Sequence, residues 1–297
     1  MLFRSEVRDS FPQKYLESIC EENGHIYSVP FQMDIMMFWV NQELLKQAGL
    51  DEIKNTGDFD ILQKSLKNPD QYAYGDAWEN THVYNSLSQF VNFWGGDYFD
   101  WTDPKTKDAA RYMKSMLDEK NTSPAQFVDQ YEQMEEKFIR GKYGCVFMYT
   151  SALGTFLDAD VYGKNKIHMA PLPVLHKKKA TNIATWQYVL NNASENKDAA
   201  VRFLQYAAGY EGSTEYAKIM KSYPARVDVI ENEDIDLEGI DMIRKYLREY
   251  TLNARPLCEN SMGAVSDMGK LFQGYVLGQC EEDSFFEQAQ NCINTYY

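Results

Sequence analysis

The sequence has 297 residues, 44% of them hydrophobic and 25% charged, and no apolar run approaches the roughly 18 residues that a membrane-spanning helix needs. We therefore expect a soluble globular protein of two lobes or domains. The 44 acidic and 30 basic residues give a net charge of −14, which repels phosphate groups and argues against nucleic acid or an anionic lipid surface as a partner.

Residues 24–49 predict a strand followed by a helix that Gly49 closes. Asp34 is a lone carboxylate in the apolar middle of this stretch, four residues after Pro30. A carboxylate among apolar side chains is costly unless it is hydrogen-bonded or faces water. Asp34 is therefore the first residue of the chain that calls for an explanation.

An amphipathic helix is predicted to begin at Pro104. Asp103 is a typical N-cap residue, and proline is favoured at the first helical position. Apolar residues then recur at i, i+4, i+7 and i+8, which places them on one helix face. These residues are Ala109, Met113, Met116 and Leu117.

A second helix carries Tyr131, Met134 and Phe138 on one face and is expected to stop at Gly141. Residues 143–149 follow directly and read Y-G-C-V-F-M-Y. A short apolar run of this length predicts a buried strand.

Two strands and a helix are predicted next along the chain. Residues 166–173 form a strand ended by prolines, and residues 184–192 form a strand rich in aromatic and β-branched residues. Asn196 then opens a helix that ends at Gly209 or Gly212. The inner side of that helix is expected to be Ala199, Ala200, Phe203, Leu204 and Ala207.

Residues 230–239 are too acidic and polar to form part of a core, so we expect a linker there. Three helical patterns follow, at residues 240–250, 262–277 and 284–296. Strands separated by helices predict an α/β fold with crossover connections.

Residues suited to catalysis or metal binding form no recognisable motif. The sequence lacks the signatures of serine hydrolases, P-loop proteins, dinucleotide-binding proteins and zinc proteases. Its five cysteines and four histidines have no metal-ligand spacing, so we expect no metal and no cofactor, and one disulfide stays open. Carboxylate pairs such as Asp97 with Asp100, or Glu135 with Glu136, would suit a glycosidase, but 44 acidic residues produce such pairs by chance.

Aromatic residues are abundant, with 21 Tyr, 16 Phe and 5 Trp. Rings with an apolar face and a polar edge suit a sugar, which presents both C–H faces and hydroxyl groups. Any one of these residues is explained equally well as part of a core. Four of them are expected at the ends of elements or in loops, where they can meet a ligand: Tyr84, Trp94, Tyr149 and Trp186.

Short segments, none of them specific alone, occur in the order typical of one family. They are G-H-I-Y-S-V-P (24–30), N-Q-E-L-L-K-Q-A-G-L (41–50), W-G-G-D (94–97), F-I-R-G-K-Y-G (138–144), A-P-L-P (170–173), N-K-D-A-A-V-R-F-L-Q-Y (196–206), Y-P-A-R (223–226) and L-G-Q (277–279). The chain thus resembles the extracellular solute-binding proteins of ABC importers, and more specifically the carbohydrate-binding branch that includes the maltose-binding proteins.

This resemblance implies an α/β, two-lobe periplasmic-binding-protein-like fold of type II, in which a hinge joins the lobes and the ligand lies in the cleft between them. The N-terminal lobe would be incomplete, because the family pattern includes about a hundred earlier residues. The expected bounds are 1–32 and 188–235 for the N-terminal lobe, 34–186 and 236–297 for the C-terminal lobe, and 32–34, 186–188 and 232–236 for the hinge crossings.

The resemblance also implies ligand-binding positions. Asp34 follows the Y-x-x-P segment, where sugar-binding relatives carry a polar residue that faces the cleft, although a hinge aspartate that caps the next turn would fit as well. Arg226 lies in a P-A-R turn and is equally explained as a structural arginine. The full set is Asp34, Tyr84, Asn85, Trp94, Tyr149, Ser151, Trp186, Gln187, Arg226, Arg255 and Glu259.

The function that the resemblance implies is binding without catalysis: a component of an ABC importer that closes around a sugar or oligosaccharide. Its partners would be the carbohydrate and the membrane permease subunits, and we expect a monomer. The full-length protein would be periplasmic or a cell-surface lipoprotein, with a signal sequence that this chain lacks. Two alternatives stay open, namely a glycosidase-like hydrolase with paired carboxylates and a truncated fragment that binds no ligand.

Overall fold

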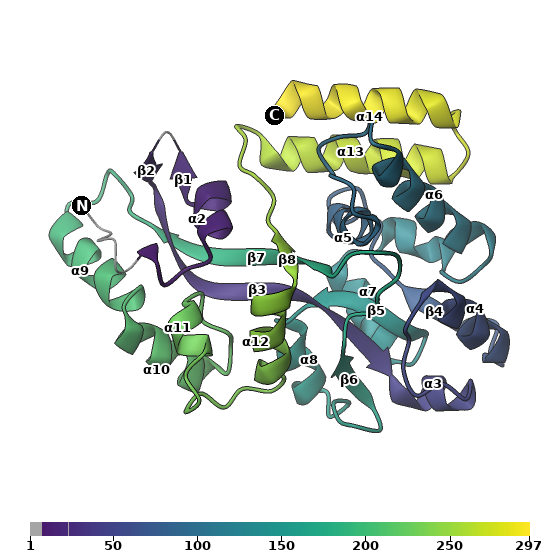
Figure 1. The fold of residues 1–297 in the computed structure, drawn as a ribbon, viewed down its shortest axis with the longest axis horizontal. Coiled ribbons are helices and arrows are strands. Elements are labelled where there is room, and N and C mark those ends of the chain that lie inside the picture. Colours follow the sequence, from purple (N-terminus) through teal and green to yellow (C-terminus); the bar gives the residue numbers. More distant parts are fainter. Residues whose placement is uncertain (1–7, 23) are drawn as a thin grey trace. The chain divides into compact units, whose positions relative to one another are not determined.

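The computed structural model describes residues 8–22 and 24–297, which form the mixed α/β fold that the sequence predicts (Figure 1). These residues make two compact units, each built from two separate stretches of chain. Unit 1 consists of the described residues up to Ile35 together with Ile183–Leu257. Unit 2 consists of Met36–Asn182 and Cys258–Tyr297.

The units differ at one point from the lobes expected from the sequence. The expected crossings near 32–34 and 186–188 lie within a few residues of unit boundaries, whereas the third, 232–236, lies inside unit 1. The chain beyond 236 stays in unit 1 because Arg244 donates hydrogen bonds to the carbonyls of Ile230 and Asn232, each at 2.8 Å. A hinge role for any of these segments stays a prediction.

Unit 1 contains short helices around one half of a long antiparallel strand pair. Its elements are α2 (Gln13–Ile19), β1 (Glu21–Glu22), β2 (His25–Ile26), the first part of β3 (Ser28–Asn41), the last part of β7 (Ala180–Val189), α9 (Lys197–Ala207), α10 (Tyr210–Met220), α11 (Val227–Ile230), α12 (Ile240–Glu249) and β8 (Thr251–Asn253). Strand β3 pairs with β7 from Ser28↔Val189 to Ile35↔Ile183, and the register shifts after Pro30. Proline has no N–H to donate to a ladder, which accounts for an irregularity at this position.

Unit 2 contains the remaining elements. They are α3 (Gln42–Gln47), α4 (Thr56–Ser65), β4 (Tyr72–Gly75), α5 (Tyr84–Trp94), α6 (Pro104–Asp118), η1 (Pro124–Val128), α7 (Tyr131–Ile139), β5 (Tyr143–Tyr149), α8 (Ala152–Asp158), β6 (Ile167–Ala170), α13 (Ser261–Val276) and α14 (Glu282–Tyr296). Here β5 pairs in parallel with β4 and antiparallel with the end of β3, which also pairs with β6. The predicted strand 143–149 is confirmed as β5.

The core of unit 2 is aromatic. Trp39, Trp78 and Trp101 have no exposed surface, and the β3 residues from Met36 to Val40 are all buried. A strand covered on both faces reads as a continuous apolar run, which explains the unbroken pattern around Trp39. Helices α13 and α14 lie side by side at the C-terminal end of the chain (Figure 1).

Several predicted helices are confirmed with their caps. Helix α6 starts at Pro104, and Asp103 Oδ1 accepts a hydrogen bond from the Lys105 N–H at 2.9 Å. Helix α7 ends before Gly141, whose φ of 70° is in the left-handed region that glycine adopts without strain. The three helices expected after residue 239 correspond to α12, α13 and α14.

Some expectations about element positions are wrong. Only Leu204 is buried on α9, and Phe203, expected on the inner side, is 53% exposed. The expected end of this helix near Gly209 is confirmed, since α9 ends at Ala207, and α10 begins directly after Gly209. Trp186 lies within β7 and not at its end, because the strand starts at Ala180, earlier than expected.

Candidate functional site

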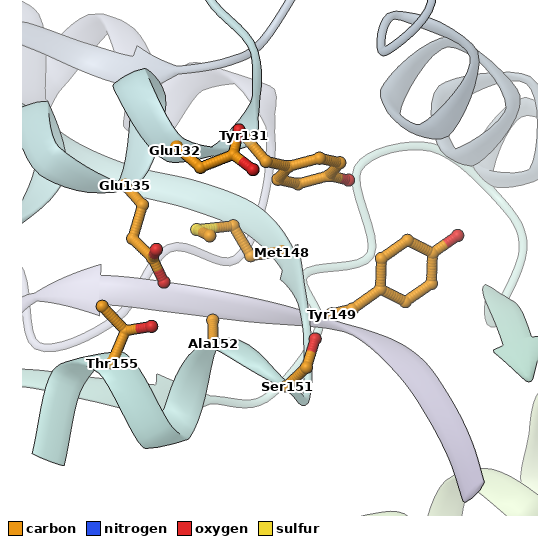
Figure 2. Close-up of a pocket in the computed structure, with 8 residues that line it drawn as sticks. All are labelled: Tyr131, Glu132, Glu135, Met148, Tyr149, Ser151, Ala152 and Thr155. Atoms are coloured by element: carbon orange, nitrogen blue, oxygen red, sulfur yellow. The ribbon is translucent and has the colours of Figure 1, made fainter. Parts of the chain in front are cut away.

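A cavity of about 290 Å³ opens in unit 2 between α7, α8 and the end of β5 (Figure 2). Its wall contains aromatic, acidic and hydroxyl side chains. The lining residues are Tyr131, Glu132, Glu135, Met148, Tyr149, Ser151, Ala152 and Thr155. This mixture of apolar faces and convergent polar groups is typical of a site for a small polar ligand.

Two tyrosines come to the cavity from the ends of their elements. Tyr149 is the last residue of β5 and Tyr131 is the first residue of α7, and their ring centroids are 6.4 Å apart with an angle of 49° between the planes. Tyr149 Oη donates a hydrogen bond to Asn85 Oδ1 at 3.2 Å. Three residues that were expected in a site thus lie close together here, namely Asn85, Tyr149 and the cavity residue Ser151, and ligand contact by them stays a prediction.

Glu132 and Glu135 face the cavity from successive turns of α7, and Figure 2 shows the Glu135 carboxylate directed toward Thr155. Burial raises the pKa of Glu135, a hydrogen bond from Thr155 lowers it, and the nearby charge of Glu132 raises it. The net result is a pKa above the usual value for glutamic acid. The cavity thus contains a carboxylate whose negative charge is partly uncompensated.

A compact polar cluster supports Tyr131 from the segment before α5. Glu79 Oε2 accepts hydrogen bonds from the Thr81 N–H at 2.9 Å and the Thr81 hydroxyl at 2.5 Å, and it lies 3.0 Å from His82 Nδ1. The His82 ring in turn packs edge-on against Tyr131 at a centroid distance of 5.7 Å. These contacts fix the position of the Tyr131 ring at the cavity.

Asp76 anchors the same segment from inside the core. Its carboxylate accepts hydrogen bonds from the Tyr74 hydroxyl at 2.8 Å, the Ala77 N–H at 2.8 Å and Trp78 Nε1 at 2.7 Å. Burial raises the pKa of Asp76 to about 6, although these hydrogen bonds act to lower it. The position of the segment therefore depends on a carboxyl group with an unusual pKa.

The other expected site residues of unit 2 have different surroundings. Tyr84 is the first residue of α5 and packs edge-on against Tyr98 at 4.8 Å. Trp94 is only 8% exposed; its ring packs against Tyr112 at 4.9 Å and stacks on the exposed His176 ring at 5.0 Å. Glu259 is exposed just before α13. The cavity is not lined by any of these three residues among those that the structure describes.

None of the expected site residues of unit 1 lines the cavity of unit 2 in the described part of the chain. Asp34 is 5% exposed on β3, opposite Ala184, while Trp186 is 61% exposed on β7. Gln187 accepts a hydrogen bond from the Ser28 hydroxyl, and Arg255 is partly exposed after β8. Ligand contact by these residues stays a prediction.

Arg226 has the contacts of the structural alternative that its P-A-R turn suggested. Its guanidinium is buried and donates to Asp228 Oδ2 at 2.6 Å, the Ala208 carbonyl at 2.9 Å and the Ser10 hydroxyl at 2.7 Å. These bonds tie three parts of unit 1 together.

The α7 side of the cavity was not predicted from the sequence. Tyr131 was expected on the apolar face of a helix, and Glu135 was explained as one half of a chance pair with Glu136. One signal was available: around the helix, Glu135 and then Glu132 lie next to Tyr131, at one border of the apolar face that Met134 and Phe138 form.

Three further findings concern metal sites, membrane-spanning helices and thiols among the described residues. No group of three or more His, Cys, Asp or Glu residues in 8–22 and 24–297 is placed to hold a metal ion. No helix in the same ranges is long and apolar enough to cross a membrane. All five cysteines are free thiols, of which Cys20 and Cys145 are buried.

The fold is that of two-lobe periplasmic binding proteins. A maltose-bound MalE3 of T. maritima aligns with 97% of this chain and 76% of its own length at 16% identity, with a TM-score of 0.80. A solute-binding protein of an ABC transporter from Thermotoga lettingae, bound with α-D-tagatose, aligns with 99% of this chain and 78% of its own length at 16% identity, with a TM-score of 0.84.

The chain belongs to the bacterial extracellular solute-binding protein family, which its sequence matches over residues 4–214. An arabinooligosaccharide-binding protein of Bacillus subtilis is 23% identical over 77% of this chain and 55% of its own length. A probable amino-acid ABC transporter periplasmic-binding protein of Sinorhizobium fredii is 24% identical over 76% of this chain and 54% of its own length. The chain thus spans about half the length of these curated relatives.

Proposed function

We propose that this chain recognises a sugar or oligosaccharide as the substrate-binding component of an ABC importer and acts without covalent chemistry. The observation that carries the proposal is the cavity of unit 2, where Tyr131 and Tyr149 lie beside carboxylate and hydroxyl groups. One relative named for arabinooligosaccharides, and structural neighbours bound to maltose and tagatose, support a carbohydrate. The relative named for amino acids makes an amino acid the rival ligand.

The side chains of the cavity suit the surface of a sugar. The apolar C–H face of a pyranose ring packs against tyrosine, and its hydroxyls bond to carboxylate and hydroxyl oxygens. In this arrangement Tyr149 supplies the ring, and Ser151, Thr155 and Glu135 supply polar partners.

We further propose that ligand binding closes a hinge between two lobes and that the permease subunits recognise the closed form. Binding at micromolar strength corresponds to about 8 kcal/mol, enough to select a closed state a few kcal/mol above the open one. In this proposal the protein is an extracytoplasmic monomer, periplasmic or anchored as a lipoprotein in its full-length form.

Calorimetric titration with a panel of arabino- and malto-oligosaccharides, monosaccharides and amino acids tests the proposal. We expect a sugar to bind and Tyr149→Ala to weaken that binding about tenfold or more, because the stacking surface is lost. Tyr206→Ala is the matched control, since Tyr206 is 51% exposed on α9 of unit 1.

Three results would contradict the proposal, each in a different way. Binding of amino acids alone would favour the rival ligand. Turnover of a glycoside that is lost in Glu135→Gln would favour the glycosidase alternative. If the folded chain bound no member of the panel, it would be a fragment without ligand-binding activity.

A further inference from the structure

The cavity of unit 2 carries negative charge and no positive charge among the described residues that line it. Glu132 and Glu135 are its two charged groups, and none of the other lining residues is Lys, Arg or His. The two glutamates are one helical turn apart on α7, so their charges repel each other. A neutral sugar would leave that repulsion in place.

The basic residue of α7, Lys137, and the residue that directly follows this helix, Arg140, are paired with other carboxylates. Lys137 forms an ion pair with Asp129, and Arg140 forms one with Glu136. In the part of the chain that the structure describes, the ion pairs of this helix thus involve the carboxylates outside the cavity and not those inside it. The two cavity glutamates remain available to a positively charged group from outside.

The remaining wall also suits a cation. Tyr131 and Tyr149 present their rings on one side of the cavity, and the Ser151 and Thr155 hydroxyls come from the start of α8 and the residue before it (Figure 2). An ammonium group is attracted to a tyrosine face and donates three hydrogen bonds, which carboxylate and hydroxyl oxygens accept. The half-buried position of Glu135 strengthens such a charge-assisted bond compared with one at the open surface.

We infer that this cavity selects a sugar that carries a protonated amine in place of a hydroxyl group, with Glu135 and Glu132 binding the ammonium and Tyr149 packing on the sugar ring. The inference rests on the proposed function. That proposal identifies the ligand as a sugar, and the negative charge of the cavity adds only the preference for an amine. Glu135 is then the residue that determines specificity.

The test compares matched sugar pairs that differ only by an ammonium or a hydroxyl group at C2. Calorimetry at pH 7 and low salt would use glucosamine with glucose, galactosamine with galactose, and mannosamine with mannose. We expect the amino sugar of at least one pair to bind about tenfold or more tightly than its neutral partner, and the ratio to fall as salt increases.

The charge of Glu135 is tested by Glu135→Gln, which keeps the shape of the side chain and should bring the two members of that pair to nearly equal affinity. Glu136→Gln is the control, because Glu136 is the next residue of α7 and pairs with Arg140. It should leave the preference unchanged. Circular dichroism verifies folding, and Glu132→Gln provides the same test if Glu135→Gln does not fold.

The outcomes separate this inference from the proposed function. Equal affinity for both members of every pair would overturn the amine preference and leave sugar binding intact. Binding of ethanolamine as tightly as the amino sugar would overturn the role of the sugar ring. Failure of every sugar, neutral or amino, to bind would overturn the proposed function and this inference together.

Discussion

The two units bury their aromatic residues to different extents. Unit 2 contains four of the five tryptophans, of which Trp39, Trp78 and Trp101 are fully buried and Trp94 is 8% exposed. The one tryptophan of unit 1, Trp186, is 61% exposed.

The helices of the two units show the same difference in burial. In unit 2, α5 buries eight of its residues, whereas α9 of unit 1 buries only Leu204 and leaves Phe203 and Tyr206 exposed. An apolar helix face shows which side could be covered, but not whether other parts of the chain cover it. The contrast teaches that the tryptophans and α5 of unit 2 are covered by other parts of the chain, whereas Trp186 and one face of α9 in unit 1 are not.

The largest expected effect is the removal of a core tryptophan from unit 2. Trp78 packs against Phe127 and Phe272 at 5.5 Å and donates a hydrogen bond to Asp76. Trp78→Ala should lower the free energy of unfolding by about 3–5 kcal/mol, because it leaves a large cavity and removes one of the hydrogen bonds to the Asp76 carboxylate. Urea denaturation followed by circular dichroism measures this change, and a loss below about 1 kcal/mol would contradict the picture of a dense core.

The next effect concerns the pH dependence of stability through Asp76. Its pKa is raised to about 6 in the folded protein and has an ordinary value near 3.9 when unfolded, so the folded state binds the proton more tightly. The stabilisation is therefore present below about pH 4 and is lost as the pH rises to about 6, by roughly 3 kcal/mol. Because other groups titrate as well, the measurement is the difference between the native chain and Asp76→Asn across this pH range.

The free energy of unfolding of the native chain, minus that of Asp76→Asn, should have its highest value near pH 4 and should fall as the pH rises to about 6. A difference that stays constant with pH would show that Asp76 titrates normally.

A smaller effect is expected from Arg226 in unit 1. Arg226→Met keeps much of the side-chain volume but removes the donors to the Ala208 carbonyl, Ser10 and Asp228. We expect a loss of about 2–3 kcal/mol, because the buried Ala208 carbonyl loses its guanidinium donor and two further hydrogen bonds of Arg226 are lost. Thermal and urea unfolding measure the change. Unaltered stability together with lost sugar binding would instead assign Arg226 to the ligand.

The smallest effect on stability is expected for Trp186→Ala, the unit 1 counterpart of Trp78→Ala. Trp186 is largely exposed, so the free energy of unfolding should change by no more than about 0.5 kcal/mol. Calorimetric titration of the same variant tests whether Trp186 contacts ligand, as the sequence predicts. A stability loss close to that of Trp78→Ala would remove the contrast between the units.

Local signals in the sequence were reliable guides to the fold. The Asp103–Pro104 cap and the uninterrupted run from Tyr143 to Tyr149 depend on neighbouring residues only, and both were predicted correctly. The exposed face of α9 was not, because coverage depends on what the rest of the chain supplies.

Only part of the candidate site was predicted, again because its contacts depend on where the fold places distant parts of the chain. The bond between Tyr149 and Asn85 joins residues 64 positions apart, and only the fold brings them together. Tyr149, Asn85 and Ser151 were expected from resemblance to a family, whereas Glu132 and Glu135 were not, because the segments that carry the resemblance include none of residues 131–137. A cavity lined by α7 and α8 becomes visible only when both helices are placed against β5.

The discontinuity of both units has a consequence for how the chain is made. The first part of strand β3 is synthesised before its unit 1 partner in β7, which begins only at Ile183, after the whole stretch Met36–Asn182. At about 5–20 residues per second, this delay is on the order of 10 s. During that interval the first part of β3 lacks its β7 partner, so the newly made chain presents an apolar edge on which a chaperone would act.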